Sequence, residues 1–262
     1  MNYQYIIFQA DQGVAKITFN RPDVLNSFNR PMAKEVQNAL AVCEKDKNVR
    51  AVLLTGEGRA FSAGQDLAEA APQDRPWPEI SDIVRESYNP IILAIRNLEK
   101  PVVCAVNGVA AGAAANIALA CDLVLASEKA SFLQAFCHIG LIPDSGGTFF
   151  LPRLAGLQRA TAMAMLGEKI SAAQALEWGM IYKLYPAETL MEEAKKLAIH
   201  LATQPTRGLG LIKRALNQSL RNDLETQLKV EAELQSLAGK TADCKEGITA
   251  FLEKRKPQFI GK

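Results

Sequence analysis

The sequence lacks a strong excess of charge of either sign. Its 262 residues include 30 Lys and Arg against 28 Asp and Glu, a formal net charge of +2. A protein that is held on nucleic acid or on an anionic membrane by a general electrostatic field needs a larger basic excess. We therefore expect neither nucleic acid nor membrane among its partners.

Cysteine is present, but without the pattern of a structural site. The cysteines are odd in number, widely spaced and free of any Cys-x-x-Cys pair: Cys43, Cys104, Cys121, Cys137 and Cys244. This spacing predicts neither a disulfide framework nor a zinc site. We expect reduced, mostly buried thiols in a cytoplasmic protein, and no metal.

A continuous hydrophobic run long enough to span a membrane is also missing. The most apolar stretch, 102–125, is interrupted by glycine, asparagine and aspartate, so it predicts a buried strand, a turn and a helix. Residues 1–5 show neither the basic nor the apolar region of a secretory signal, which again favours the cytoplasm.

What is present is the composition of a globular protein with a sizeable core: 48% of residues are hydrophobic and 22% are charged. In the first half, β-rich runs alternate with stretches of helical spacing, which predicts α/β crossovers. The expected strands are 3–9, 14–19, 51–55, 101–106 and 122–126, the first two forming a hairpin, and the expected helices are 31–46, 80–98 and 113–120.

Beyond residue 144 the pattern predicts an almost wholly helical chain, with helices at 159–166, 172–178, 190–202, 209–219, 223–238 and 241–255. We expect an α/β core over 1–195 and a C-terminal helical region over 196–262 that is too thin to fold alone. Three prolines fall within 71–78, which predicts a surface loop and a candidate lid.

The stretch Gly140-Leu-Ile-Pro-Asp-Ser-Gly-Gly-Thr148 contains one acid, Asp144. Pro143 disfavours helix at the residue before it, so the chain enters as a turn, and the glycines permit close approach of a ligand. Two interpretations remain open from these residues. Asp144 is either a carboxylate that carries a proton or the N-cap of the following helix.

Turns rich in small residues precede expected helices in segments 61–67, 107–113 and 140–148. The first N–H groups of a helix have no partner within it, and two of them aimed at one oxygen would form an oxyanion hole. Taken alone, each turn is better explained by packing and turn geometry than by a ligand site.

Several short motifs occur in a fixed order. They are Asn20-Arg-Pro22 with Leu25-Asn26-Ser27, Ala60-Phe-Ser-Ala-Gly-Gln-Asp66, Ala105-Val-Asn-Gly108, Cys121-Asp122, Ile142-Pro-Asp-Ser-Gly-Gly-Thr148, and Glu246-Gly with Phe251-Leu-Glu-Lys-Arg255. Together they resemble the enoyl-CoA hydratase/isomerase (crotonase) superfamily along essentially the whole chain. The resemblance implies an α/β fold, the crotonase (ClpP-like) spiral of ββα repeats, with a C-terminal helical trimerisation region. It also implies an acyl-CoA substrate, a homotrimer or dimer of trimers, and no separate cofactor, since coenzyme A is carried within the thioester.

Carried over by motif position, the resemblance implies two main-chain donors to the thioester oxygen, the N–H groups of Gln65 and Ala113. It places Ala63, Asp66 and Leu67 at the adenine end of CoA, where main-chain groups make the contacts. The side chain of Asp66 has a second interpretation, as the cap of the following helix.

Phe251 and Lys254 stand where the family reaches across a trimer interface to a neighbour's CoA. Their spacing is equally that of one core aromatic and one solvated lysine. His138 lies near Asp144, but the chain has no Gly-x-Ser-x-Gly elbow, so we expect a structural histidine and not a nucleophile's base.

The departures from the family pattern decide the expected reaction. Hydratases of the family carry two glutamates at the positions of Asn116 and Phe136, and neither of these residues can act as base for water or as acid for carbon. A hydratase is therefore not expected. Asp144 remains as the acid, and apolar neighbours (Phe136, Leu141, Ile142, Phe149) are expected to exclude water and raise its pKa. Asn116 is expected either to bond the substrate or Asp144, or to be a satisfied polar residue of a buried helix.

A single carboxylate beside an oxyanion hole suits an isomerase that moves a proton next to a thioester. The resemblance implies conversion of the ring epoxide of phenylacetyl-CoA to oxepin-CoA, in phenylacetate catabolism. The alternatives are a Δ3,Δ2-enoyl-CoA isomerase of fatty-acid oxidation and, in another class, a non-catalytic homologue that binds CoA or RNA.

Overall fold

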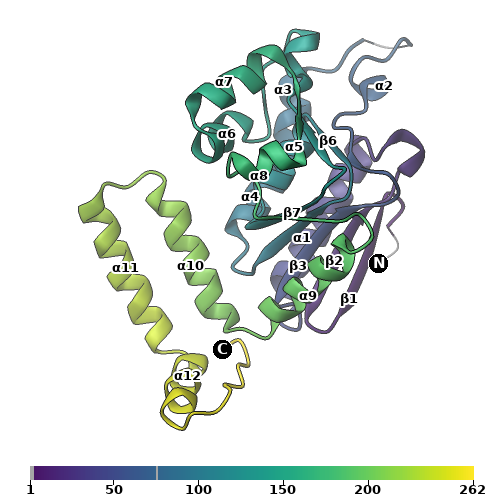
Figure 1. Cartoon of the computed structure of the whole chain (residues 1–262). Helices are drawn as coiled ribbons and strands as arrows, with labels where there is room; N and C mark the ends of the chain where they lie inside the picture. The colour runs from purple at the N-terminus through teal and green to yellow at the C-terminus, as the bar shows by residue number, and fades with distance from the viewer. Residues whose placement is uncertain (1–2, 75) are drawn as a thin grey trace.

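The computed structural model describes residues 3–74 and 76–262, and two sheets organise its N-terminal part (Figure 1). The larger sheet has the order β1 (Ile6–Asp11), β2 (Val14–Phe19), β3 (Ala51–Gly56), β5 (Val102–Val106), β7 (Leu123–Ser127) and β10 (Lys183–Tyr185). The smaller sheet has the order β4 (Ala60–Ser62), β6 (Val109–Ala111), β8 (Ser131–Leu133) and β9 (Lys169–Ser171). The pairs β1–β2 and β8–β9 are antiparallel, and the other pairs are parallel.

The chain passes repeatedly from the larger sheet to the smaller one and then into helix. β3 leads to β4, β5 to β6, and β7 to β8. The helices that follow these pairs are α2 (Leu67–Ala70), α3 (Ile80–Ile83) and α4 (Asn89–Asn97), then α5 (Ala113–Leu119), then α6 (Gly147–Ala155) and α7 (Leu157–Leu166). This succession confirms the expected spiral of ββα repeats.

The central strand β3 is buried on both faces. Val52 and Leu54 pack in the main core with α1 (Arg30–Lys45), while Ala51 and Leu53 pack with α9 (Leu190–Ala202). A parallel strand covered on both sides is apolar throughout, which is why its sequence shows no alternation. The expected division after residue 195 falls inside α9, whose buried residues remain against the sheet as far as Ala202.

The opening hairpin is confirmed, with Gln12 and Gly13 in the left-handed conformation that a tight turn requires. The expectation of an almost wholly helical chain beyond Asp144 is wrong in two places, because β9 and β10 add strands to the two sheets before and after α8 (Ala172–Glu177). Three-residue strands are too short to show a period. In the expected loop 71–78, Arg75 lies outside the described residues, and the others form neither helix nor strand.

The C-terminal region comprises α10 (Thr206–Ser219), α11 (Leu224–Gly239) and α12 (Ala242–Leu252), and Figure 1 shows α10 and α11 as a hairpin that projects from the core. Its attachment is polar: Lys213, which is only 6% exposed, donates to Asp122 at 2.8 Å, and Arg207 and Arg214 form ion pairs with Glu99. Within the described ranges, no helix has the length and apolarity needed to cross a membrane.

Candidate active site

The loop after β4 presents the first expected oxyanion donor. The Phe28 N–H donates to the carbonyl of Gly64 at 2.7 Å, and the Asp66 N–H donates to the carbonyl of Phe28 at 2.8 Å. Because successive N–H groups of extended chain point to opposite sides, the Gln65 N–H faces away from Phe28. It has no acceptor in the described part of the chain and is available to a ligand.

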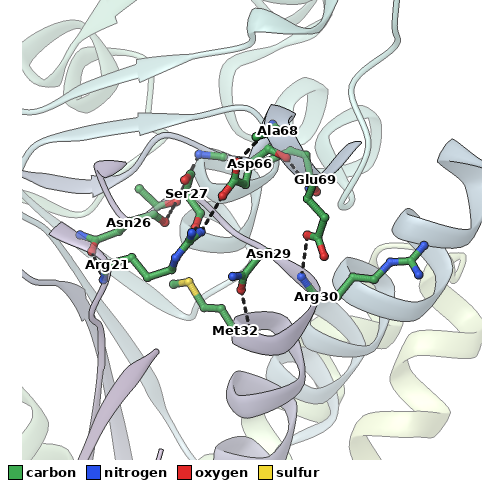
Figure 2. Close-up of polar contacts among 12 residues, drawn as sticks. Arg21, Asn26, Ser27, Asn29, Arg30, Met32, Asp66, Ala68 and Glu69 are labelled. Carbon is green, nitrogen blue, oxygen red and sulfur yellow. Dashed lines mark hydrogen bonds and ion pairs between the residues drawn. The ribbon is translucent and has the colours of Figure 1, made fainter. Parts of the chain in front are cut away.

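The Asn20–Ser27 motif braces this loop, as Figure 2 shows. The Arg21 guanidinium donates to the carbonyl of Ser27 at 2.6 Å and to one carboxylate oxygen of Asp66 at 2.9 Å. The other oxygen of Asp66 accepts from the Ala68 N–H at 3.2 Å and caps α2. The capping interpretation of the Asp66 side chain is thus confirmed, and the main-chain N–H and carbonyl of this residue are also bonded within the protein.

The other residues expected at the adenine end lie in the same loop. The Ala63 N–H donates to the carbonyl of Leu25 at 2.9 Å, which fixes the backbone there. Leu67, at the start of α2, is 55% exposed. The CoA contacts of Ala63, Asp66 and Leu67 stay predictions.

The second expected donor lies beside the first. Ala113 is the first residue of α5, so its N–H has no acceptor within the helix. Gly64 has φ +88°, and a Cβ built on it would lie 2.7 Å from the carbonyl oxygen of Ala111 and 3.8 Å from the nitrogen of Ala113. A side chain at Gly64 would push the two segments apart. The glycine therefore permits the close approach of the segment that carries Gln65 to the start of α5, and the convergence of the two N–H groups on one oxygen stays a prediction.

Asp144 lies in the loop between a 3₁₀ turn (Ala135–Ile139) and α6. Gly146, with φ +78°, is the N-cap of α6, and the Gly147 N–H donates to the main-chain carbonyl of Asp144 at 2.8 Å. Among described residues, the Asp144 carboxylate accepts only the hydroxyl of Ser145, at 2.7 Å. The interpretation of this carboxylate as a helix cap is therefore wrong, because the glycine turn caps α6 with main-chain groups.

Asn116, on α5, anchors the Asp144 loop by a hydrogen bond. Its side chain is 0% exposed, and its Nδ2 donates to the main-chain carbonyl of Asp144 at 2.8 Å. Its Oδ1 accepts from Nε2 of Gln134 at 2.9 Å, so the amide is satisfied inside the protein. A Cβ on Gly147 would lie 2.5 Å from Nδ2 of Asn116, which explains the glycine there. Of the expected roles, the structure combines two: Asn116 is a satisfied buried residue, and it contacts Asp144 through the main chain and not through the carboxylate.

The apolar residues expected around Asp144 differ in their burial. Phe136 is 8% exposed, and its ring lies 3.7 Å from where a Cβ of Gly112 would stand, beside the second donor. The expectation that Leu141 and Ile142 exclude water from Asp144 is wrong within one chain, because both are exposed, Ile142 at 78%. Burial raises the pKa of the Asp144 carboxyl above its usual value, and the hydrogen bond from Ser145 lowers it in part.

Tyr88 belongs to the site although no motif indicated it. It ends a π-helical turn (Val84–Tyr88) between α3 and α4, is 2% exposed, and donates its hydroxyl to Oε1 of Gln65 at 2.6 Å. Burial, and after it the negative charge of Asp144, raises the pKa of Tyr88. Tyr88 therefore links the first donor residue to the neighbourhood of the carboxylate. Its sequence context is that of any core aromatic in a helix.

Phe251 and Lys254 do not reach this site within one chain. They lie at the end of α12, far from α5 and α6 in Figure 1, and Phe251 is 83% exposed. Their contact with a neighbour's CoA stays a prediction. The ring of His138 bonds the carbonyl of Gly167 at 3.0 Å, which engages it away from Asp144.

Known proteins are similar to this chain in sequence and in fold. Residues 9–262 match the family described as enoyl-CoA hydratase/isomerase. The chain is 50% identical to the 1,2-epoxyphenylacetyl-CoA isomerase of Escherichia coli over 99% of each chain. It is 40% identical to the trans-2-decenoyl-[acyl-carrier-protein] isomerase of Streptococcus mutans over the full length of both. The crystal structure of the enoyl-CoA hydratase of Bacillus anthracis is 34% identical, with a TM-score of 0.91 over 99% of this chain and 100% of that one. The chain is therefore an enzyme of the enoyl-CoA hydratase/isomerase family, and it has the crotonase fold.

Proposed function

We propose that this enzyme is an acyl-CoA isomerase in which Asp144 carries the proton. The observation that supports this proposal most is the absence of a carboxylate at the two positions where hydratases of the family carry glutamates. The hydratase positions are held by Asn116, whose amide is bonded inside the protein, and by the phenyl ring of Phe136. Asp144 supplies the remaining carboxylate; it is half-buried, and its loop is bonded to α5, the helix that begins at the expected donor Ala113.

The proposed isomerisation moves one proton within the substrate and consumes no other reactant. The Asp144 carboxylate takes a proton from the carbon α to the thioester carbonyl, and the bonding electrons move to the thioester oxygen. The N–H groups of Gln65 and Ala113 hold the enolate oxygen while the negative charge resides there. The electrons then return, and the carboxylic acid delivers its proton to another carbon of the acyl group.

The proposed substrate is the ring epoxide of phenylacetyl-CoA. Its conversion to oxepin-CoA also requires the ring C–C bond that carries the epoxide oxygen to open, with its electrons and the ring π electrons rearranging within the substrate, so no further reactant is consumed. The name of the Escherichia coli relative, at 50% identity, supports this acyl group. A linear enoyl thioester is the second candidate, because the relative from Streptococcus mutans is named as an isomerase of a decenoyl chain.

Assay of the purified enzyme on the ring-epoxide thioester and on 3-hexenoyl-CoA separates the two candidates. We expect turnover of the epoxide and slower formation of the conjugated enoyl thioester. Turnover of the linear substrate alone would overturn the proposed acyl group. If neither thioester reacts and the protein binds RNA with a steep salt dependence, the isomerase proposal itself fails.

The burial of Asp144 predicts the pH dependence of the reaction. A base must be ionised, so kcat/KM falls as pH decreases through the pKa of the carboxyl. Because burial raises this pKa, we expect the acid limb of the profile above the value near 4 of an ordinary aspartate. A pH–rate profile with the limb at that ordinary value would contradict the proposed environment.

We also propose assembly as a homotrimer or a dimer of trimers, in the cytoplasm. Several leucines of the projecting hairpin are exposed, among them Leu216 at 60% and Leu224 at 75%. A second copy would cover them, and it would bring Phe251 and Lys254 toward a neighbour's ligand.

A further inference from the structure

Ser145 makes the direct side-chain contact with the proposed proton carrier. Its hydroxyl donates to Oδ1 of Asp144 at 2.7 Å, and the serine is 2% exposed. Since the hydroxyl is out of water, this bond is not exchanged for one to solvent. A hydrogen bond to a charged acceptor at this depth is stronger than one at the surface.

The backbone of Ser145 is strained in order to make this contact. Its φ is +51°, in the left-handed region that residues other than glycine seldom adopt. Glycine adopts this conformation more easily than serine, and the next two residues, Gly146 and Gly147, are glycines. Position 145 nevertheless carries a serine. Strain of this kind persists where surrounding contacts impose it, and it gathers at active sites.

The Asp144 peptide itself is fixed from two other directions. The main-chain carbonyl accepts both from Nδ2 of Asn116 and from the Gly147 N–H, each at 2.8 Å. With the backbone fixed, the remaining freedom of Asp144 is rotation of its side chain. The Ser145 hydroxyl removes that freedom and occupies Oδ1, and among described residues Oδ2 has no partner.

We infer that Ser145 is a positioning residue for the proposed isomerisation: it holds the Asp144 carboxylate in one orientation and leaves Oδ2 as the oxygen that takes and returns the proton. This inference rests on the proposed function. It explains why a strained serine stands in a turn where glycine would fit more easily. A single acting oxygen also means that the proton leaves and returns on the same face of the acyl group.

The test compares Ser145→Ala and Ser145→Gly with the wild-type enzyme on 3-hexenoyl-CoA. Both variants lose the hydroxyl, so in both we expect kcat to fall about tenfold, KM to change little, and the acid limb of the pH profile to move up by about one unit. The direction follows because the hydroxyl stabilises the ionised carboxylate. Glycine relieves the left-handed strain and alanine does not, so Ser145→Gly should have a higher thermal midpoint than Ser145→Ala.

The two variants separate positioning from folding. If Ser145→Gly keeps the wild-type kcat and pH profile, the serine serves the turn alone and the inference is overturned. If Ser145→Ala fails to fold, the glycine variant still gives the answer. Ser219→Ala, an exposed serine on α10, controls for the loss of a hydroxyl elsewhere.

Asp144→Asn, measured in the same series, distinguishes the two levels of the proposal. If that variant is inactive while both Ser145 variants match the wild type, only the role of Ser145 fails. If Asp144→Asn remains fully active, the proposed function fails as well.

Discussion

Replacement of Asp144 by asparagine is expected to lower kcat about a thousandfold, within the range that positioned proton transfer contributes. Asparagine has nearly the same shape, and its amide oxygen can still accept from the Ser145 hydroxyl. It cannot take up a proton, so the enolate does not form. The measurement is the steady-state rate of conjugated enoyl thioester formation by both proteins at one pH.

The control for this variant is its stability. The wild-type site keeps a partly desolvated charge, which burial disfavours, so the neutral amide should leave the thermal midpoint unchanged or raise it. Loss of activity with an intact midpoint assigns the effect to chemistry. A rate within tenfold of the wild type would remove Asp144 from the mechanism.

Replacement of Asp122 by alanine is expected to cost about 3–5 kcal/mol of the free energy of unfolding, the usual result of removing one partner of a buried ion pair. One carboxylate oxygen accepts from Lys213 and from the Val102 N–H, each at 2.8 Å, and the other accepts from Arg96 at 3.2 Å. Lys213 is 6% exposed, so without Asp122 it would be a buried charge with its opposite charge removed. Urea unfolding followed by circular dichroism gives the difference.

The matched control is Glu225→Ala, which removes the exposed pair between Glu225 and Lys229 on α11. An exposed pair contributes little, so this variant should unfold close to the wild type. Because Asp122 ties α10 to the core, the Asp122 variant should also release the C-terminal region to limited proteolysis. If the two variants unfold alike, the buried pair does not hold the region in place.

The larger features of the fold follow from patterns that the chain displays locally. The central strands β3 and β5 are apolar runs because both of their faces are buried, and α1 begins where Asn29 accepts the N–H of Met32. The sequence pattern did not predict the short strands β9 and β10, because their extended conformation depends on pairing with distant strands. The order of the motifs identified the family, and Asn116 and Phe136 in place of glutamates argued against a hydratase.

The sequence by itself therefore determined the family, the spiral fold and the acid on which the proposed chemistry depends. Only the tertiary structure decided how that acid is held. Asn116 meets Asp144 across 28 residues of chain, Gln134 meets Asn116 across 18, and Tyr88 meets Gln65 across 23. Even the contact between the neighbours Asp144 and Ser145 depends on a left-handed backbone that the residue types disfavour. The direction of a side chain is set by the path of the whole chain around it, whereas a strand or a helix declares itself in the spacing of its own residues.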